Sequence, residues 1–473
     1  MVTSFVTSLS GALLLVGTLP GAAAEYKVDS HDAIVESSRS LAKDLMTFYH
    51  GDEPGETPGI LPGPPPTGDY YWYTGASFWA TYLDYWHLTG DDSYNDVTTQ
   101  GLLFQVGPND DYMPPNVTAS LGNEDQCFWG TAALLAAEYG LPTPEGQPRW
   151  IDLAQNVWTT QADPTRHDDT CGGGLRWQIP LSNNGYEWKQ AMSNGCFFNM
   201  GTRLARFTGN ATFADSSEET WNWLTGVGFI DKETWAVYDG AHAHENCTDI
   251  SKVQWSYNPA VLIQGAAFMY NFTNGSDVWR ERADKLSDAL LETFFPDGIA
   301  YEVACEENEK CPTDALFMKG YVHRWLSSAT QVAPFLADKL LPVLQTSAEA
   351  AAKQCVGGGD DGTVSQRCGF YWSNGTFVDP VDTDGTSGVG EGLSVFAAVS
   401  SLLVSGAAAP ATAATSGDAG NSSGTSQDGS PSGTADGTSP SGTAASGSGV
   451  GRFRVEVMMS LLIGVVVVFA WVV

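Results

Sequence analysis

The chain has 473 residues, among them 16 Trp, 17 Tyr and 21 Phe, and its formal net charge at pH 7 is −33. This length and aromatic content suffice for one large core, and for a single domain of about four hundred residues if the fold is a closed barrel. The charge argues against nucleic acid as a partner, because the phosphate backbone would be repelled, whereas a neutral sugar would not be.

The first 24 residues have the pattern of a secretory signal peptide. An apolar stretch at 11–19 is followed by Gly-Ala-Ala-Ala, which predicts cleavage after Ala24, although no Lys or Arg precedes Lys27. Asn-x-Ser/Thr sequons support secretion. They lie at Asn116, Asn210, Asn246, Asn271, Asn274, Asn374 and Asn421.

An even number of cysteines, eight, suggests four disulfides in a secreted chain, although 105 connectivities are formally possible. We expect two local bridges, with two more following by elimination: Cys305–Cys311, Cys355–Cys368, Cys127–Cys196 and Cys171–Cys247. No Cys-x-x-Cys pair is present, and His242-Ala243-His244 is better interpreted as a polar loop than as a metal site. Nothing in the sequence calls for a metal or a cofactor.

From residue 31 to 404 the hydrophobic pattern is helical throughout. In the first candidate, 31–49, Ile34, Leu41, Leu45 and Phe48 have spacings compatible with one helical face. Further helices are predicted at 75–89, 92–105, 124–139, 149–162, 191–208, 211–226, 258–273, 277–295, 313–329, 331–353 and 385–404.

A weak internal repeat links these helices in pairs. The segments 87–96, 206–215 and 271–280 each end one helix at a Gly or Asn turn and begin another. Hairpins recurring every fifty to seventy residues or so predict an all-α fold, an (α/α)6 barrel of six helical hairpins spanning 25–404. The helices that start near 124, 191 and 258 would be inner helices whose openings converge on one cleft, walled by the long link 171–190.

After Val404 the composition changes to Ser, Gly, Thr, Ala and Pro, which predicts a disordered stalk over 405–448. An apolar run then ends the sequence without a basic flank. We therefore expect a GPI-attachment propeptide at 449–473, with Ser446 as the attachment residue, rather than a transmembrane helix.

The strongest candidate site is GNEDQCFWG, residues 122–130, where Glu124 and Asp125 are adjacent carboxylates at a predicted helix start. Retaining glycosidases use two carboxyl groups about 5–5.5 Å apart, and mutual repulsion would let one of them keep a proton and act as the acid. A purely structural alternative is a capping box, with Asn123 as N-cap and Gln126 as the third helical residue.

Other polar and aromatic residues lie at the same helix openings or in nearby loops. Trp72, Trp177 and Tyr257 are candidates for sugar stacking, and Asn194 and Asn258 for hydroxyl binding; Ser193 shares its opening with Asn194. For each of them core packing is the alternative. The remaining substrate-binding candidates are Gln126, Trp129 and Asp239.

The chain resembles glycoside hydrolase family 76, specifically the fungal GPI-anchored branch of α-1,6-mannanase-like cell-wall proteins. The segments that carry the resemblance span most of 30–400 in order: YYWYTGASF, YWHLTGDDSY, GNEDQCFWG, GGGLRW, MSNGCFFNMGTRLARFTGN and VQWSYNPAVLIQGA. The resemblance implies an (α/α)6 barrel and a retaining endo-α-1,6-mannosidase acting on α-mannan or a GPI-core glycan. The family's two consecutive Asp residues fall on Glu124, as nucleophile, and Asp125, as acid/base. Glu at 124 is a departure, as is Tyr257-Asn258-Pro259-Ala260 in place of Tyr-Asn-Gln-Gly.

For the fungal branch, the resemblance also implies transfer of GPI-glycoproteins to a β-glucan acceptor. We expect a monomer on the extracellular face of the plasma membrane, held by a GPI anchor, or in the cell wall. One alternative is a catalytically inactive mannan-binding wall protein, which Glu124 would favour. Another is an (α/α)6 enzyme for uronic acids, but its basic candidates Arg176, Lys189 and Arg324 are scattered in the sequence.

Overall fold

A computed structural model describes residues 26–65, 67–356 and 367–416, all within one compact unit. The predicted signal peptide, Ser446, the predicted GPI propeptide and most of the predicted stalk lie outside these residues. Among the helices of the described ranges, none is both long enough and apolar enough to cross a membrane.

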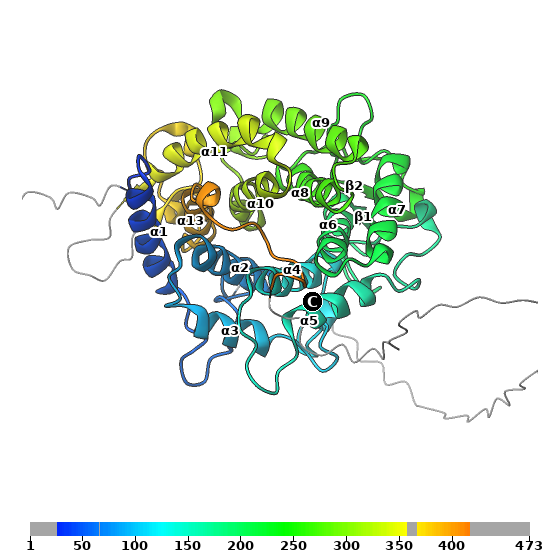
Figure 1. Cartoon of the computed structure of the whole chain (residues 1–473), viewed down its shortest axis with the longest axis horizontal. Coiled ribbons are helices and arrows are strands. Elements are labelled where there is room, and N and C mark those ends of the chain that lie inside the picture. The colour runs from blue at the N-terminus through cyan, green and yellow to red at the C-terminus, as the bar shows by residue number, and fades with distance from the viewer. Residues whose placement is uncertain (1–25, 66, 357–366, 417–473) are drawn as a thin grey trace, which may run out of the picture. The chain divides into compact units, whose positions relative to one another are not determined.

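Two concentric rings of helices form the fold (Figure 1). The inner ring consists of α2 (Trp72–Thr89), α4 (Asn123–Tyr139), α6 (Ala191–Thr208), α8 (Tyr257–Phe272), α10 (Met318–Val332) and α13 (Val389–Ser401). Each inner helix contacts the next one, and α13 contacts α2, so that the ring is closed. The outer ring consists of α1 (His31–Met46), α3 (Asn95–Phe104), α5 (Trp150–Gln161), α7 (Ala211–Val227), α9 (Asp277–Phe294) and α11 (Ala337–Ala352).

This arrangement confirms the predicted all-α (α/α)6 barrel. From α2 to α11, inner and outer helices alternate as consecutive hairpins. The remaining pair is made by the two ends of the fold, because α1 packs mainly on α13 and less extensively on α2, its neighbour in sequence. A single-turn helix that the sequence does not predict, α12 (Pro380–Thr383), precedes α13.

Burial explains why each helix belongs to its ring. Along the inner helices α4, α6, α8 and α13 nearly every residue is buried, because neighbours cover both sides and an outer helix covers the back. The outer helix α9 instead buries one stripe with helical spacing, which is the pattern of a helix with one face in water. That stripe is Trp279, Ala283, Leu286, Ser287, Leu290 and Phe294.

The predicted turns at the ends of inner helices are also observed. Gly90, Gly140 and Gly209 end α2, α4 and α6 with φ of 75°, 71° and 74°, a left-handed conformation that glycine adopts without steric cost. In the third repeat segment, Asn274 and Gly275 take this conformation after α8. The sequence repeat therefore reflects one recurring way of ending a helix.

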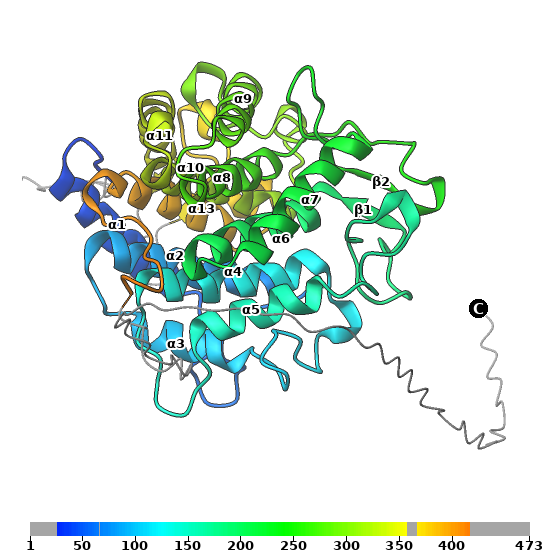
Figure 2. The ribbon, with the colours of Figure 1, turned by 45° about the vertical axis from the view of Figure 1, so that its right-hand side comes forward.

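The link 171–190 is irregular and ends in a short strand, β1 (Trp188–Gln190). This strand pairs antiparallel with β2 (Gly240–His242), with Lys189 opposite Ala241, beside α6 and α7 (Figure 2). A second short pair joins β3 (Cys355–Val356) to β4 (Arg367–Cys368). The strands thus connect loops rather than build a core.

All four expected disulfides are present: Cys127–Cys196, Cys171–Cys247, Cys305–Cys311 and Cys355–Cys368. The first joins the inner helices α4 and α6 within one turn of Glu124, and the second ties the link 171–190 to the loop after β2. These two bridges therefore hold the elements around the predicted cleft.

Candidate active site

The predicted pair of carboxylates lies in the first turn of α4, at the end of the barrel where the inner helices begin. The N-cap of this helix is Gly122, and its N–H donates to the Asp125 carboxylate at 2.7 Å. The capping box predicted from Asn123 and Gln126 is therefore wrong by one residue. Asp125 caps its own helix, so its carboxylate is held in place whatever chemistry it performs.

Glu124 is held from the neighbouring helix. The Ser193 hydroxyl donates to Glu124 Oε2 at 2.8 Å, and the Gln190 amide donates to the same oxygen. Ser193 lies in the first turn of α6, and Gln190 is its N-cap. The disulfide Cys127–Cys196, with 6.2 Å between its Cα atoms, fixes α4 against α6 just below this contact.

The surroundings raise the pKa of both carboxyl groups. Burial raises the pKa of Glu124 well above its usual value, and the charge of Asp125 adds to this, while the Ser193 hydrogen bond opposes it. Burial likewise raises the pKa of Asp125 to about 7, against the opposing hydrogen bond from Gly122. Two carboxyl groups this close share a proton near neutrality, because ionising one disfavours ionising the other.

A third acid, Asp314, faces the pair and is absent from the sequence-based candidates. It lies in the 3-10 helix η6 (Thr313–Phe317), and the Tyr73 hydroxyl donates to its Oδ1 at 2.5 Å. Its charge raises the pKa of both Glu124 and Asp125. The signal was available, since Asp314 opens a predicted helix, as Glu124 does.

Asp239 and Tyr257 lie around the same space. Burial raises the pKa of Asp239 to about 6. The pKa of Tyr257 is raised first by burial and then by the charges of Glu124, Asp239 and Asp314. These groups therefore surround a common cleft, as expected for Asp239 and Tyr257. Trp177 is half-buried beside them, and its indole opposes the rise in the pKa of Glu124.

Below the pair, stacked aromatic rings form the floor of the cleft. Phe128, one turn after Asp125, stacks on Tyr73 at 5.4 Å and on Tyr321 at 5.0 Å between ring centroids. Tyr321 stacks on Trp325 at 5.0 Å. A narrow cavity continues below Phe128 along the barrel axis, and the ion pair of Arg324 with Asp84 lines it.

Other expected substrate contacts occupy structural positions. Gln126 is fully buried and holds Arg166 and the Asp111 carbonyl, each at 2.8 Å. Asn194 is 1% exposed, and its amide bonds the backbone of the link at Leu175. Neither side chain has surface left for a sugar.

Two tryptophans and a second asparagine complete this set. Trp129 is fully buried between Trp72 and Tyr112, at centroid distances of 5.1 and 5.6 Å. Trp72 is half-buried, and its indole N–H donates to Gln105. Asn258 is buried, with neither amide atom hydrogen-bonded to protein. The aromatic pair therefore packs the barrel.

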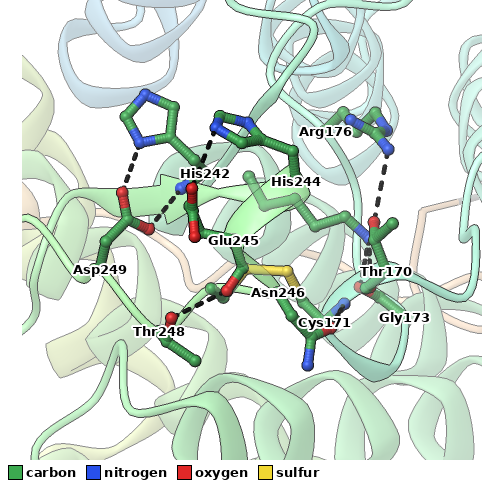
Figure 3. Close-up of a disulfide and its surroundings, with 12 residues drawn as sticks. Thr170, Cys171, Gly173, Arg176, His242, His244, Glu245, Asn246, Thr248 and Asp249 are labelled. Carbon is green, nitrogen blue, oxygen red and sulfur yellow. Dashed lines mark hydrogen bonds and ion pairs between the residues drawn. A yellow bond between two sulfur atoms is a disulfide. The ribbon is translucent and has the colours of Figure 1, made fainter.

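The link 171–190 is fastened to the loop after β2, as Figure 3 shows. The disulfide Cys171–Cys247 joins them, and the Asn246 side chain accepts from the Cys171 N–H at 2.7 Å. His242, the last residue of β2, pairs with Asp249 of this loop at 2.5 Å. Over the described residues, no group of three His, Cys, Asp or Glu side chains is placed to hold a metal ion.

The basic residues weighed for a uronic-acid enzyme are all engaged by acids. Arg176 and Lys189 both bind Asp168, at 2.6 and 3.2 Å, and Arg324 binds Asp84. Lys189 is fully buried and also donates to the carbonyls of the link. Arg176 and Lys189 hold the wall of the cleft, whereas Arg324 lines the cavity below Phe128.

Comparison with known proteins identifies the family. The family model Glycosyl hydrolase family 76 matches residues 33–414. The mannan endo-1,6-alpha-mannosidase DCW1 of Saccharomyces cerevisiae is 40% identical over 398 residues, which cover 84% of each chain. Mannan endo-1,6-alpha-mannosidase DFG5 of the same yeast is 36% identical over 391 residues, which cover 82% of each chain.

Solved structures agree with this match. Dfg5 from Chaetomium thermophilum, in complex with glucosamine, is 56% identical with a TM-score of 0.80, covering 82% of this chain and 95% of that one. An inactive variant of the α-1,6-mannanase GH76A of Salegentibacter sp. HEL1_6, in complex with α-1,6-mannotriose, shares the fold at 17% identity and a TM-score of 0.61, covering 78% of this chain and 99% of that one. On the family match and on the identity and coverage of its relatives, the chain belongs to glycosyl hydrolase family 76.

Proposed function

We propose that the protein is a retaining, endo-acting α-1,6-mannosidase with Glu124 as nucleophile and Asp125 as acid/base. The observation that carries the proposal is the pair of adjacent carboxyl groups at the opening of an inner helix, each with a different set of partners. Two side-chain donors, Ser193 and Gln190, hold Glu124 and favour its ionised form. Asp125 has one backbone donor, and the charge of Asp314, which raises the pKa of both carboxyl groups, favours retention of one proton on the pair.

The mechanism follows from these roles. Asp125 protonates the glycosidic oxygen as Glu124 attacks the anomeric carbon, so the C–O bond breaks and a mannosyl-enzyme ester forms. Asp125, now ionised, then takes a proton from the incoming water or sugar hydroxyl, which attacks the anomeric carbon and releases Glu124. Two inversions leave the anomeric configuration unchanged.

The substrate is an α-1,6-linked mannan or a GPI-core glycan. The names of the yeast relatives and the mannotriose bound by the bacterial enzyme support the linkage. The glucosamine in the Chaetomium structure supports a glycan that carries an amino sugar, whose ammonium group suits a cleft lined by Glu124, Asp125, Asp239 and Asp314. Partly exposed Trp177 and Tyr257 offer ring faces for stacking.

We further propose that the enzyme transfers GPI-glycoproteins to β-glucan at the cell surface. A retaining mechanism permits this, because a sugar hydroxyl can intercept the mannosyl-enzyme in place of water. The signal peptide, the GPI anchor at Ser446 and the monomeric state remain predictions from the sequence. The second candidate function is a mannan-binding wall protein without turnover, favoured by Glu at position 124.

The test follows the products of an α-1,6-mannooligosaccharide and of a GPI-core glycan by mass spectrometry, with and without a β-glucan acceptor. We expect Glu124→Gln and Asp125→Asn to lower turnover by at least about 10²-fold, because each removes a group that takes part in bond breaking. Asp338→Asn, on the exposed face of the outer helix α11, is the control and should keep full activity. The first-formed product should be the α-anomer by proton NMR.

Three outcomes separate the possibilities. Acceptor-linked products that require both carboxyl groups would establish transfer, and shortened products alone would establish hydrolysis. Saturable binding of mannooligosaccharide with no turnover by the wild type would reject the enzyme and leave the binding protein.

A further inference from the structure

Asp314 is held at the cleft by features outside the catalytic helix. The disulfide Cys305–Cys311 closes a small loop immediately before it, and Ala315 and Leu316, which follow it, are fully buried. Its carboxylate stays accessible at the cleft and accepts from the Tyr73 hydroxyl of α2. Burial raises the pKa of Asp314 and the Tyr73 hydrogen bond lowers it, so Asp314 is a carboxyl group fixed at the cleft whose ionised form Tyr73 favours.

The position of Tyr73 shows on which side of the pair this charge lies. The Tyr73 ring stacks on Phe128, one turn after Asp125, so its hydroxyl rises from the α2 side of α4. Glu124 is held from the opposite side, by Ser193 and Gln190 of α6. The catalytic pair therefore lies between the donors of α6 and the third acid.

The proposed mechanism requires that the Glu124–Asp125 pair keep one proton, and a negative charge nearby favours this. The N-terminus of α4, the Gly122 N–H and the two donors on Glu124 all favour ionised carboxylates. A doubly ionised pair cannot protonate the leaving oxygen. A nearby acid that ionises first opposes the loss of the last proton.

We propose that Asp314, oriented by Tyr73, is a positioning residue that keeps one proton on the Glu124–Asp125 pair. The inference rests on the proposed function, in which this proton is delivered to the leaving sugar. The titratable groups that face the pair are Asp314 of η6, Tyr73 of α2, Tyr257 of α8, Tyr321 of α10 and Asp239 of the loop before β2. The tyrosine pKa values are all raised by burial, so the tyrosines stay neutral and the acids set the local charge.

The test is the pH dependence of kcat/KM on an α-1,6-mannooligosaccharide, measured on the full chain. In Asp314→Asn the side chain keeps its shape and loses its charge, so the loss of activity at high pH should move to lower pH by about one unit. Activity on the acidic plateau should stay within about threefold of the wild type. The control Asp338→Asn should leave the profile in place.

Tyr73→Phe separates charge from orientation. It removes the hydrogen bond that lowers the pKa of Asp314, but at the pH of the high-pH limb Asp314 is still ionised, so this limb should stay within a few tenths of a unit while the plateau falls. If the high-pH limb of kcat/KM does not move in Asp314→Asn, the proposal is overturned, whether or not the plateau falls. Such a result is expected of a purely structural or sugar-binding residue, which would not change the pKa of the carboxyl pair.

An infrared titration provides a readout that does not need turnover. The C=O stretch of the protonated carboxyl pair, assigned with Glu124→Gln and Asp125→Asn, should disappear at lower pH in Asp314→Asn than in the wild type. An inactive wild type would reject the proposed function, and the infrared result would still decide for or against the effect of Asp314 on the pair.

Discussion

The hydrogen bonds on Glu124 explain how a longer side chain serves at this position. An extra methylene group relative to Asp moves the carboxylate by more than about one ångström. In this structure the Glu124 carboxylate reaches α6, where Ser193 and Gln190 donate to one of its oxygens. Since both donors are held close to α4 by the disulfide Cys127–Cys196, the carboxylate has a defined position despite its length.

Ser193→Ala tests this account. Because the Ser193 hydrogen bond lowers the pKa of Glu124, its loss should raise that pKa, and a nucleophile must be ionised to react. Hydrogen bonds to charged groups contribute about 1.5–3 kcal/mol, so we expect the acidic limb of kcat/KM to move to higher pH by about one unit or more. This is opposite in direction to the shift expected for Asp314→Asn.

Ser216→Ala, on the outer helix α7, is the matched control and should not move the limb. If Ser193→Ala lowers activity equally at every pH, Ser193 affects the fold or the bound sugar rather than the ionisation of Glu124.

At the residue scale, the sequence identifies the helix starts that form the site, but not which of two adjacent residues at each start points into it. Successive residues on a helix point about 100° apart. Thus Ser193 faces Glu124 while Asn194 turns to the link, and Asp125 faces the cleft while Gln126 turns to Arg166. Only the packing of α4 against α6 decides these directions, and no local pattern encodes it.

At the scale of helices, the sequence predicts the twelve long helices within a few residues, because their glycine turns and apolar stripes are local. Two helix starts are exceptions. The helix predicted from 331 begins at Ala337, after the 3-10 helix Pro334–Leu336. The helix predicted from 313 begins at Met318, and 313–317 form the 3-10 helix η6, which is where Asp314 sits. The loop closed by Cys305–Cys311 lies just before η6, and α10 starts after it, so Asp314 precedes the helix instead of lying in its first turn.

Beneath this region a buried acidic network joins the start of α8, the segment 302–306 and α10. Ser256, the N-cap of α8, donates both its N–H and its hydroxyl to Glu302, and Glu306 pairs with Lys319 at 2.7 Å. All four residues are buried. Burial, followed by the charge of Glu306, raises the pKa of Glu302 to about 8. The start of α8, with Tyr257, therefore depends on a carboxyl group that stays protonated.

Stability should consequently fall as pH rises. Between the unfolded pKa of a glutamate, about 4.3, and the folded value, Glu302 binds a proton only in the folded state, so raising the pH through this window favours unfolding. One such group gives a slope of at most about 1.4 kcal/mol per pH unit. In Glu302→Gln the amide oxygen can still accept from Ser256, and the fall in Tm between pH 5 and 8 should become shallower.

The matched variant Glu292→Gln, at an exposed position of α9, should keep the wild-type slope. Equal pH slopes for Glu302→Gln and the wild type would mean that Glu302 is already ionised in the folded protein.

At the scale of the whole barrel, the segment after α13 closes the end opposite the cleft. Residues 404–416, the orange segment that crosses the ring in Figure 1, form what we term the C-terminal strap. Their backbone bonds the last turns of four inner helices. The contacts are Gln331 to the carbonyls of Val404, Ala407 and Ala408, His87 to Ala408, Ala411 to Glu138, and Ala413 to Phe207.

The amino-acid composition of residues 404–416 does not predict that they pack on the barrel, because Ser, Ala and Thr contribute little apolar surface. The strap is held through its backbone, by side chains and backbone carbonyls that the inner helices supply. The family match, which runs to residue 414, likewise passes the end of α13. The barrel therefore extends beyond the boundary at 404 that composition favours.

Truncation tests whether the strap stabilises the fold. A chain ending at 404 should melt about 2–4 °C below one ending at 416, corresponding to roughly 2 kcal/mol once the entropy of ordering the strap offsets part of its hydrogen bonds. Because the strap lies at the ends of the inner helices farthest from Glu124, kcat/KM at 25 °C should agree within about twofold. The chain ending at 416 should have the same Tm as the full chain. Equal Tm for the two truncations would show that the strap contacts do not stabilise the fold, and that the inner ring is closed without them.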